Sequence, residues 1–548
     1  MTSSKRFVLF TRIMGILALI SFSPLRPSLD AQIVGWKQIG PAPLLISPPN
    51  GGDGKGPDSG TVVDIAIDPS GTTDQVIYIA GSGGVWKTTD GRNTWTPKTD
   101  FMPTLSVGAV ALDPADPSII YAGTGNAFNA GSGIFESVGV YRSIDGGDSW
   151  IVLNPGGMFT RTSTIQRIVL PAHDLLILAT NQGVFRSVDG GQNFGANPPL
   201  FNDRQPVLTA FISDLKVDTA SSSTIYAAVA GLGIFKSTDS GATFPSTPIF
   251  SAGSVPIPPT TFGFIAFAQS TKPNNQSFYA NVDVGTGAAS MFKSADGGST
   301  WTVVASNPFP GELQNFYDQT VGVDPQDTNR VYFGLRALYE TKDGGATGLT
   351  PANRTDLNQV HADQHALTFS PQSHSGASGA PTRLYNGTDG GIATTANEGA
   401  SWDLLNNGLA TMLFYQIDIG RGSPANNQFT YGAAQDLGLS SNNRSGLTGL
   451  QWLEGIFNDG FSIAVDPLNP THAIANQNGT FTVSSSDGTA VWPIPAAIPA
   501  INGITTINNV AFDPNGSRAY VVGGTRTNGN LLLQSTDNAA TFAQMHGI

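Results

Sequence analysis

The chain has 548 residues, of which only 12% are charged, and its net charge is −13. This acidic balance excludes a nucleic-acid partner, because phosphate binding needs a basic stripe and the 27 lysines and arginines do not cluster. Cysteine is absent, which excludes a disulfide framework, a thiol nucleophile and a zinc site with Cys ligands.

The first predicted element is a secretory signal peptide at residues 1–31. Basic residues precede the apolar stretch Ile13–Phe22, and Ala31 places a small residue before a cleavage point at Gln32. The alternative is a membrane anchor, but about ten apolar residues fall short of the ~20 that span a bilayer. We therefore expect a secreted or periplasmic protein with no membrane anchor after cleavage.

From residue 58 onward the chain repeats one phrase. Val85–Trp95 returns as Val140–Trp150, each with an Asp-Gly turn between an aromatic strand and a final tryptophan. Further copies lie at Val184–Phe194, Ile234–Phe244 and Met291–Trp301, with weaker ones around Asp343, Asn397, Asp487 and Asp537. A period of about 50 residues is typical of architectures in which each unit buries its faces only against its neighbours.

Each repeat predicts four short strands. An apolar run ends in Asp-Pro, as at Asp68-Pro69, and is followed by a second apolar run, the aromatic strand and the Trp or Phe strand. Long stretches with helical period are missing after residue 32. We therefore predict an all-β protein, a β-propeller of four-stranded blades with about ten blade repeats over residues 32–548. The alternative, which applies if the chain is a fragment, is a seven-bladed propeller at 32–410 and a partial second propeller at 411–548.

A ring of repeats removes exposed sheet edges when one terminus completes the blade begun by the other. The segment Gly35–Gly40 is predicted to be such a closing strand, because it mimics the strand that follows each Asp-Gly turn. The last repeat already has Thr541–Gln544 as its own fourth strand, so the two ends compete for one position. The sequence leaves this competition open.

The repeated phrase Ser-x-Asp-x-Gly-x-Thr-Trp resembles the Asp-box, also called the BNR repeat. This motif occurs in sialidases, in sortilin-type propellers and in glycoside hydrolase family 74 xyloglucanases, and the resemblance spans residues 58–548. In those families the box is a structural turn. We therefore expect its aspartates to cap turns through backbone hydrogen bonds. They are Asp90, Asp145, Asp189, Asp239 and Asp296.

Functional groups are expected on the face opposite the boxes, where the first strand of each blade begins and its second and third strands join. There, strand alternation predicts that His361, Asp363 and His365 share one side of a strand at Val360–Leu367. One alternative is that these residues merely form hydrogen bonds within the protein. The others are that they contact a substrate, shuttle protons or bind a metal. Because same-side positions on one strand rarely converge on one ion, we assign no metal and no cofactor.

Two aspartates on this face carry a sharper resemblance. Thr388-Asp389-Gly390-Gly391 before a strand, and Asp459-Gly460 ahead of an Asp-Pro strand, look like the two catalytic aspartate contexts of family 74 xyloglucanases. The resemblance implies that Asp389 and Asp459 form the carboxylate pair of an inverting glycoside hydrolase. The alternative interpretation is that Asp389 and Asp436 are turn residues beside glycines.

A wider set of residues on this face is predicted to contact substrate. Its members are His361, Asp363, His365, Gln435, Asp436 and Trp452, the last as an aromatic platform. The segment from His361 to Gly460 also resembles secreted bacterial sortilin-like Asp-box proteins. Two functions therefore stay open. One is a secreted protein that binds or hydrolyses a polysaccharide or oligosaccharide; the other is a non-enzymatic propeller that captures a protein or peptide. In either case we expect a monomer.

Overall fold

The computed structural model describes residues 40–46, 56–71, 73–125, 136–195, 207–254, 262–272, 274–285, 288–306, 314–350, 354–355, 359–371, 382–421, 429–442, 451–456, 459–477, 481–485, 504–515, 518–525, 529–537 and 542–545. All of them belong to the compact unit Gly40–Ile548. The predicted signal peptide, residues 35–39 of the predicted closing strand, and the weak repeat at Asp487 lie outside the described residues.

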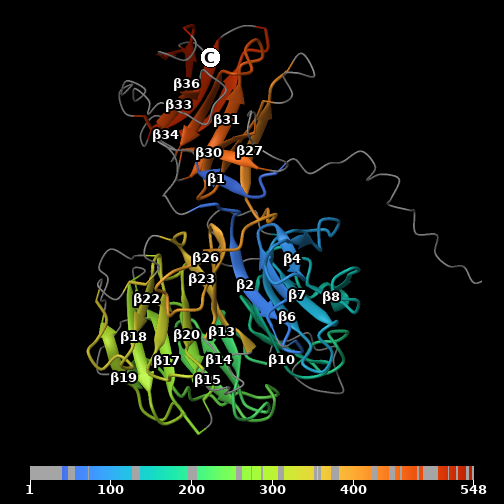
Figure 1. The fold of residues 1–548 in the computed structure, drawn as a ribbon, viewed down its shortest axis with the longest axis vertical. Coiled ribbons are helices and arrows are strands. Elements are labelled where there is room, and N and C mark those ends of the chain that lie inside the picture. The colour runs from blue at the N-terminus through green and yellow to red at the C-terminus, as the bar shows by residue number, and fades with distance from the viewer. Residues whose placement is uncertain are drawn as a thin grey trace, which may run out of the picture. The chain divides into compact units, whose positions relative to one another are not determined.

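In the described part of the chain the strands form ten sheets, and helix is confined to two short 3-10 turns, η2 (Pro155–Gly157) and η3 (Ala252–Ser254). No helix among these residues is long and apolar enough to cross a membrane. Strands that follow one another in the sequence pair antiparallel within each sheet (Figure 1). The molecule is all-β, as the composition and the repeats predicted.

Seven sheets cover the chain as far as residue 404. The first four consist of β2 (Val62–Ile67), β3 (Ile77–Gly81), β4 (Gly84–Thr88) and β5 (Thr96–Pro97); β6 (Val107–Leu112), β7 (Ile120–Thr124), β8 (Val140–Ser143) and β9 (Ile151–Leu153); β10 (Ile165–Ala172), β11 (Leu175–Thr180) and β12 (Val184–Ser187); and β13 (Ile212–Val217), β14 (Ile225–Val229) and β15 (Gly233–Ser237). The next three consist of β16 (Ile265–Gln269), β17 (Phe278–Asp283), β18 (Ala289–Ser294) and β19 (Thr302–Ser306); β20 (Thr320–Val323), β21 (Val331–Gly334) and β22 (Leu338–Thr341); and β23 (Gln364–Phe369), β24 (Leu384–Thr388), β25 (Gly391–Thr395) and β26 (Asp403–Leu404).

Three further sheets follow. They consist of β27 (Phe414–Ile419), β28 (Thr430–Ala434), β29 (Gly438–Asn442) and β30 (Trp452–Ile456), joined by β1 (Leu44–Ile46); β31 (Gly460–Val465), β32 (Ala473–Gln477) and β33 (Phe481–Ser485); and β34 (Ile504–Phe512), β35 (Ala519–Thr525), β36 (Gly529–Ser535) and β37 (Ala543–Gln544). β1 runs parallel to β30, with Leu44 opposite Trp452. A strand from the N-terminal part of the chain thus joins a later sheet.

Four sheets have three strands in the described part of the chain, where four were predicted. In three of these sheets a single β-bridge stands at the place of the fourth strand. The bridges join Val184 to Leu208, Ile234 to Phe250 and Tyr339 to Arg354. In the fourth, the segment after β33 lies outside the described residues.

The first strands of the first seven sheets contact one another in sequence, from β2 through β6, β10, β13, β16 and β20 to β23, and β23 contacts β2 in turn (Figure 1). The seam between β23 and β2 is packed rather than hydrogen-bonded as a sheet. Trp86 and Trp95 of the first sheet share a buried apolar cluster with Leu405 and Leu409. The indole N–H of Trp95 donates to the Leu405 carbonyl at 2.6 Å.

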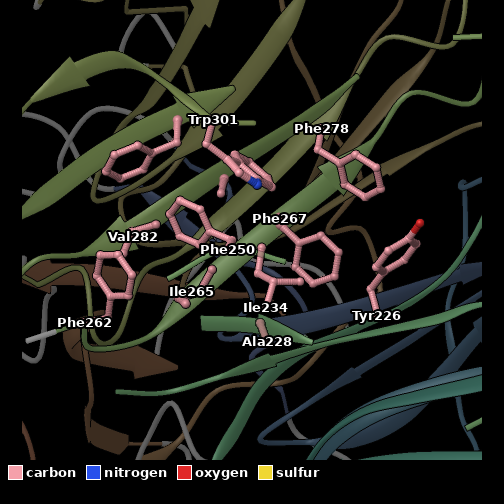
Figure 2. Close-up of a cluster of buried hydrophobic side chains, with 12 residues drawn as sticks. Tyr226, Ala228, Ile234, Phe250, Phe262, Ile265, Phe267, Phe278, Val282 and Trp301 are labelled. Carbon is pink, nitrogen blue, oxygen red and sulfur yellow. The ribbon is translucent and has the colours of Figure 1, made fainter. Parts of the chain in front are cut away.

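Aromatic side chains fill the spaces between neighbouring sheets. Figure 2 shows the cluster between the fourth and fifth sheets, where Phe250 lies against Phe262 and Trp301. Burying one such side chain contributes roughly 1.5–3 kcal/mol. This burial helps to hold the sheets together in a chain that has no cysteine to form disulfides.

The repeated Asp-Gly turns join the third strand of a sheet to the segment that follows it. In the first sheet, the Asp90 carboxylate accepts the backbone N–H of Thr94 at 3.1 Å and the Thr94 hydroxyl at 2.7 Å. The Thr94 hydroxyl and the backbone N–H groups lower the pKa of Asp90 to about 2. The same bond from the residue four positions later recurs at Asp145, Asp189, Asp239, Asp296 and Asp343. These carboxylates therefore act as turn caps.

Candidate active site

Four aspartates lie at the ends of strands on the face opposite these turns. Asp363 and Asp459 directly precede β23 and β31, while Asp389 and Asp436 lie in the β24–β25 and β28–β29 turns. Carboxylate oxygens of Asp363, Asp389 and Asp436 all lie within 4.8 Å of one another. The Oδ1 atom of Asp459 accepts the backbone N–H of Asp436 at 3.0 Å. We call these four residues the carboxylate cluster.

Asp389 is the most deeply buried member of the cluster, with 1% of its surface exposed. Its Oδ1 atom lies 3.0 Å from Nε2 of His365, and its Oδ2 atom accepts a 2.7 Å hydrogen bond from the Tyr317 hydroxyl. Burial raises the pKa of Asp389, but His365 and the hydrogen bonds lower it by more, so the net pKa is lowered. Asp389 therefore keeps its negative charge.

The turn that carries Asp389 depends on two glycines. Gly391 has φ +123°, in a region that only glycine adopts readily. A Cβ atom on Gly390 would lie 2.4 Å from Cβ of His361 and 2.8 Å from Oδ1 of Asp58. The Thr-Asp-Gly-Gly sequence thus lets the turn approach the residues before β23 closely enough to form the cluster.

The residues before β23 do not alternate as a strand. β23 begins at Gln364, Asp363 has φ +64°, and the register shifts between Gln364 and Ala366. The predicted alternation of His361, Asp363 and His365 along one strand is therefore wrong, because His361 and Asp363 precede the first residue of β23. His361 packs beside Gly390, while His365 contacts Asp389.

Asp363 is held by the sixth sheet. Its backbone N–H donates to the Arg336 carbonyl at 2.9 Å, and its carboxyl shares a hydrogen bond with Asp318. Burial raises the pKa of Asp363 to about 7, and the negative charge of Asp389 acts in the same direction. Its Oδ1 atom is buried without a hydrogen-bond partner among the described residues. Asp363 therefore loses its proton only near neutral pH.

Asp436 is half-buried and has φ +58°, an uncommon conformation for a residue with a side chain. Burial raises the pKa of Asp436 to about 10, and the charges of Asp389 and Asp459 act in the same direction. The carboxyl group also shares a hydrogen bond with that of Asp389. Asp436 therefore carries a proton at neutral pH beside an ionised neighbour.

The remaining predicted contact residues differ in exposure. Gln435 is half-buried, and its Oε1 atom accepts the hydroxyl of Tyr415 at 3.2 Å. The Tyr415 ring stacks on Phe461 with the planes 2° apart. Trp452 is only 1% exposed and packs with Leu44. Its ring faces are covered, so Trp452 belongs to the core of its sheet and has no face to offer a sugar.

Tyr317 was not identified from the sequence. It donates to Asp389 and meets the His365 ring edge-on, with centroids 4.9 Å apart. The signal was its position just before β20, because residues in the equivalent place before β23 and β31 also belong to the site. A tyrosine without a charge gave no reason to select it.

Two groups of described residues bring possible metal ligands within 4.8 Å of one another. One is Asp363, Asp389 and Asp436; the other is Asp113, His173 and Asp174 on the turn face. In the second group, His173 is already engaged, with Nδ1 3.0 Å from Asp113 and Nε2 3.4 Å from Asp174.

Arg167 of β10 lies inside the ring of first strands. Its Nε atom is 3.6 Å from Oδ1 of Asp214, and its guanidinium donates to the His365 carbonyl at 3.5 Å. Lys216 lies 3.2 Å from the same Asp214 oxygen. Charged side chains from the third and fourth sheets therefore meet inside this ring, and Arg167 also reaches a backbone carbonyl of the seventh sheet.

Comparison with known proteins gives relatives by sequence. The chain is 25% identical over 312 residues to a xyloglucanase from Paenibacillus sp and 25% identical over 308 residues to one from Hypocrea jecorina. The matches cover 48% and 50% of this chain but only 29% and 30% of the relatives. The chain thus matches less than a third of the length of these two relatives. No protein-family model matches the chain.

Comparison of structures extends over nearly the whole chain. The GH74 xyloglucanase from Xanthomonas campestris aligns with a TM-score of 0.62 at 17% identity, covering 94% of this chain and 75% of that one. The GH74 enzyme from Niastella koreensis aligns with a TM-score of 0.59 at 18% identity, covering 90% and 73%. The chain is therefore similar in sequence to xyloglucanases and has the propeller fold of the GH74 enzymes.

Proposed function

We propose that this protein is a glycoside hydrolase that cleaves a polysaccharide of the xyloglucan class at the carboxylate cluster. The observation that carries the proposal is a group of adjacent carboxyl groups whose pKa values are pushed in opposite directions. Asp389 has a lowered pKa, while the pKa of Asp436 is raised to about 10. Such divergence lets one carboxyl group hold a proton at neutral pH while a charged carboxylate lies beside it.

In this proposal Asp436 is the general acid and Asp459 is the general base. Asp436 is half-buried and holds a proton that a leaving glycosidic oxygen can take. Asp459 is also half-buried, and its Oδ1 atom accepts the Asp436 N–H at 3.0 Å, so its carboxylate is held next to the proposed acid, where we assign it the activation of water. The sequence similarity to xyloglucanases supports the choice of substrate.

Asp389, which the sequence suggested as a catalytic residue, takes a positioning role in this proposal. Its low exposure argues against direct contact with a sugar, and both of its oxygens are engaged by His365 and Tyr317. Its negative charge instead keeps the proton on Asp436. By the same criterion the buried residues His361, Asp363, His365 and Trp452 are left out of the contact set, and the half-buried Gln435 remains in it.

We further propose that the first seven sheets form one propeller, with Asp-boxes as its repeated turns, and that the sheets from β27 belong to a second one. The contact of β23 with β2 supports the first part, and the contacts of β31 with β27 and β34 support the second. The carboxylate cluster would then draw residues from both. The apolar stretch Ile13–Phe22 supports export through a signal peptide to an extracytoplasmic location, and we propose that the protein acts as a monomer.

The non-enzymatic alternative would have a peptide enter the ring of first strands. The sequence similarity to xyloglucanases favours the hydrolase over this alternative. To test the proposal, the purified chain is incubated with xyloglucan, other plant glucans and bacterial polysaccharides, and new reducing ends are measured. We expect more new reducing ends from xyloglucan than from any of the other polymers. No release from any polymer would overturn the proposal and favour a binding protein.

A further inference from the structure

Beside the carboxylate cluster lies a pair of stacked aromatic rings that the proposed chemistry does not use. Tyr415 is the second residue of β27 and Phe461 is the second residue of β31. Their ring centroids are 5.5 Å apart and their planes differ by 2°. Two strands from neighbouring sheets therefore place one aromatic ring upon another.

The two rings differ in their exposure to solvent. Phe461 is 38% exposed, although it lies next to buried positions of the same strand, whereas Tyr415 is half-buried. Phe461 differs from an isolated exposed residue in that its ring is stacked on Tyr415 and it follows Asp459 of the carboxylate cluster by two residues. Tyr415 supports Phe461 from one side, so the opposite face of Phe461 is the one available to a ligand.

The aromatic pair is tied to the carboxylates by position and by contacts. Phe461 follows Asp459 by two residues, and the Tyr415 hydroxyl donates to Gln435, which directly precedes Asp436. Burial raises the pKa of Tyr415 to about 12, and Asp459, Asp436 and Asp389 act in the same direction, which places the phenol close to the cluster. The aromatic pair and the proposed acid and base thus border one site.

A second exposed aromatic residue is adjacent in sequence to a residue that contacts the cluster. Phe316 is 52% exposed and directly precedes Tyr317, whose hydroxyl binds Asp389. Phe316 comes from the segment before β20, and Phe461 comes from β31.

We propose that Phe461, supported by Tyr415, is a platform on which one sugar ring of the glycan stacks beside the carboxylate cluster. A pyranose ring has a face of C–H groups that matches a flat aromatic ring, while its hydroxyl groups reach carboxylates and amides at the rim. The inference rests on the proposed glycan function and specifies where the sugar next to the reacting bond binds.

The test measures binding and turnover separately. Binding of xyloglucan oligosaccharides to the full chain is measured by calorimetry, and release of reducing ends from xyloglucan is measured in parallel. We expect Phe461→Ala to weaken binding about tenfold, equivalent to about 1.4 kcal/mol, and to raise KM more than it lowers kcat. Phe461→Tyr, which keeps a flat ring, is expected to restore binding.

Phe101→Ala serves as the matched control, because Phe101 is 71% exposed and lies in the first sheet's connection to β6. Circular dichroism and thermal melting of each variant exclude a folding defect. Turnover with unchanged binding in Phe461→Ala would overturn the platform and leave the hydrolase proposal standing. If the wild type binds the oligosaccharides without turnover and Phe461→Ala weakens that binding, the platform is supported and the hydrolase proposal is overturned. No binding by the wild type would overturn the platform.

Discussion

At the residue scale, burial and neighbouring charge give chemically identical aspartates different protonation states. Asp90 at a repeated turn has a pKa of about 2 because the Thr94 hydroxyl and backbone N–H groups stabilise its charge. Asp436 has a pKa of about 10 because it is buried beside other carboxylates. The turn aspartate is fixed as an anion, whereas the cluster can store a proton.

The Asp389→Asn variant tests whether Asp389 holds the proton on Asp436. Removing the negative charge at position 389 lowers the pKa of Asp436, because that charge is one of the causes of its rise. If Asp436 is the general acid, as proposed, the alkaline limb of the pH profile of kcat/KM should move to lower pH, because Asp436 then loses its proton at lower pH. Asp145→Asn, at a repeated turn, is the control and should leave the profile unchanged. An unshifted alkaline limb in Asp389→Asn would contradict the positioning role.

The Tyr317→Phe variant tests the hydrogen bond that sequence reasoning missed. It removes a 2.7 Å donor from a buried, ionised carboxylate, and a hydrogen bond to a charged group contributes roughly 1.5–3 kcal/mol. We expect a fall of that size in the free energy of unfolding, measured with urea. Tyr415→Phe removes a bond to the neutral amide of Gln435 and should cost only about 1 kcal/mol. Equal losses in the two variants would mean that Asp389 is not charged.

At the scale of single elements, the Asp389-Gly390-Gly391 turn decides whether the cluster can form. A methyl group on Gly390 would meet Cβ of His361 at 2.4 Å and a carboxylate oxygen of Asp58 at 2.8 Å. Gly390→Ala should therefore cost about 1–3 kcal/mol in unfolding free energy and reduce turnover. In the control, Gly253→Ala, the added methyl has only the Ser251 hydroxyl within 4 Å, at 3.9 Å. Stability and turnover equal to the wild type in Gly390→Ala would show that the turn can move away.

The sequence identified these elements well where local chemistry determines them. The Asp-Gly turns and the strands around them follow from short motifs, and the reversal of strand direction correctly put Asp363, Asp389, Asp436 and Asp459 on one face. Prediction from the sequence failed where contacts with another sheet override the two-residue alternation of side chains along a strand. Asp363 adopts φ +64° because its N–H bonds to Arg336 in another sheet, so the expected alternation before β23 breaks.

Exposure was the second property that the sequence did not determine. Trp452 and Phe461 are both aromatic residues near the site, yet Trp452 is 1% and Phe461 38% exposed. The difference arises because β1, from a distant part of the chain, pairs with β30 and brings Leu44 against Trp452. No local pattern in the sequence encodes that contact.

At the scale of the whole molecule, two classes of carboxylate give stability opposite dependences on pH. The pKa of Asp90, Asp145, Asp296 and Asp343 is lowered to about 2, so their contribution is present above the unfolded pKa near 3.8 and is lost as pH falls toward 2. The pKa of Asp363 is raised to about 7. Its contribution is therefore complete below 3.8 and is lost as pH rises through 7.

These opposite signs predict a maximum of stability in the mildly acidic range, near pH 4–5, with a decline toward pH 8. The raised pKa of Asp436 extends the decline to higher pH. Thermal melting across this range measures the profile, and Asp363→Asn should flatten it between pH 4 and 7. A wild-type profile that rises steadily to pH 8 would contradict the assigned pKa directions.

The most direct test of the proposed chemistry compares reducing-end release from xyloglucan by the wild type, Asp436→Asn and Asp459→Asn, with Asp145→Asn as the control. Removal of a general acid or base typically costs 10²–10⁴-fold in rate. We predict losses of about that size in the two cluster variants and none in the control, with thermal melting to confirm that all four proteins fold. Wild-type turnover in both cluster variants, or no turnover in the wild type, would contradict the assignment of hydrolysis to the carboxylate cluster.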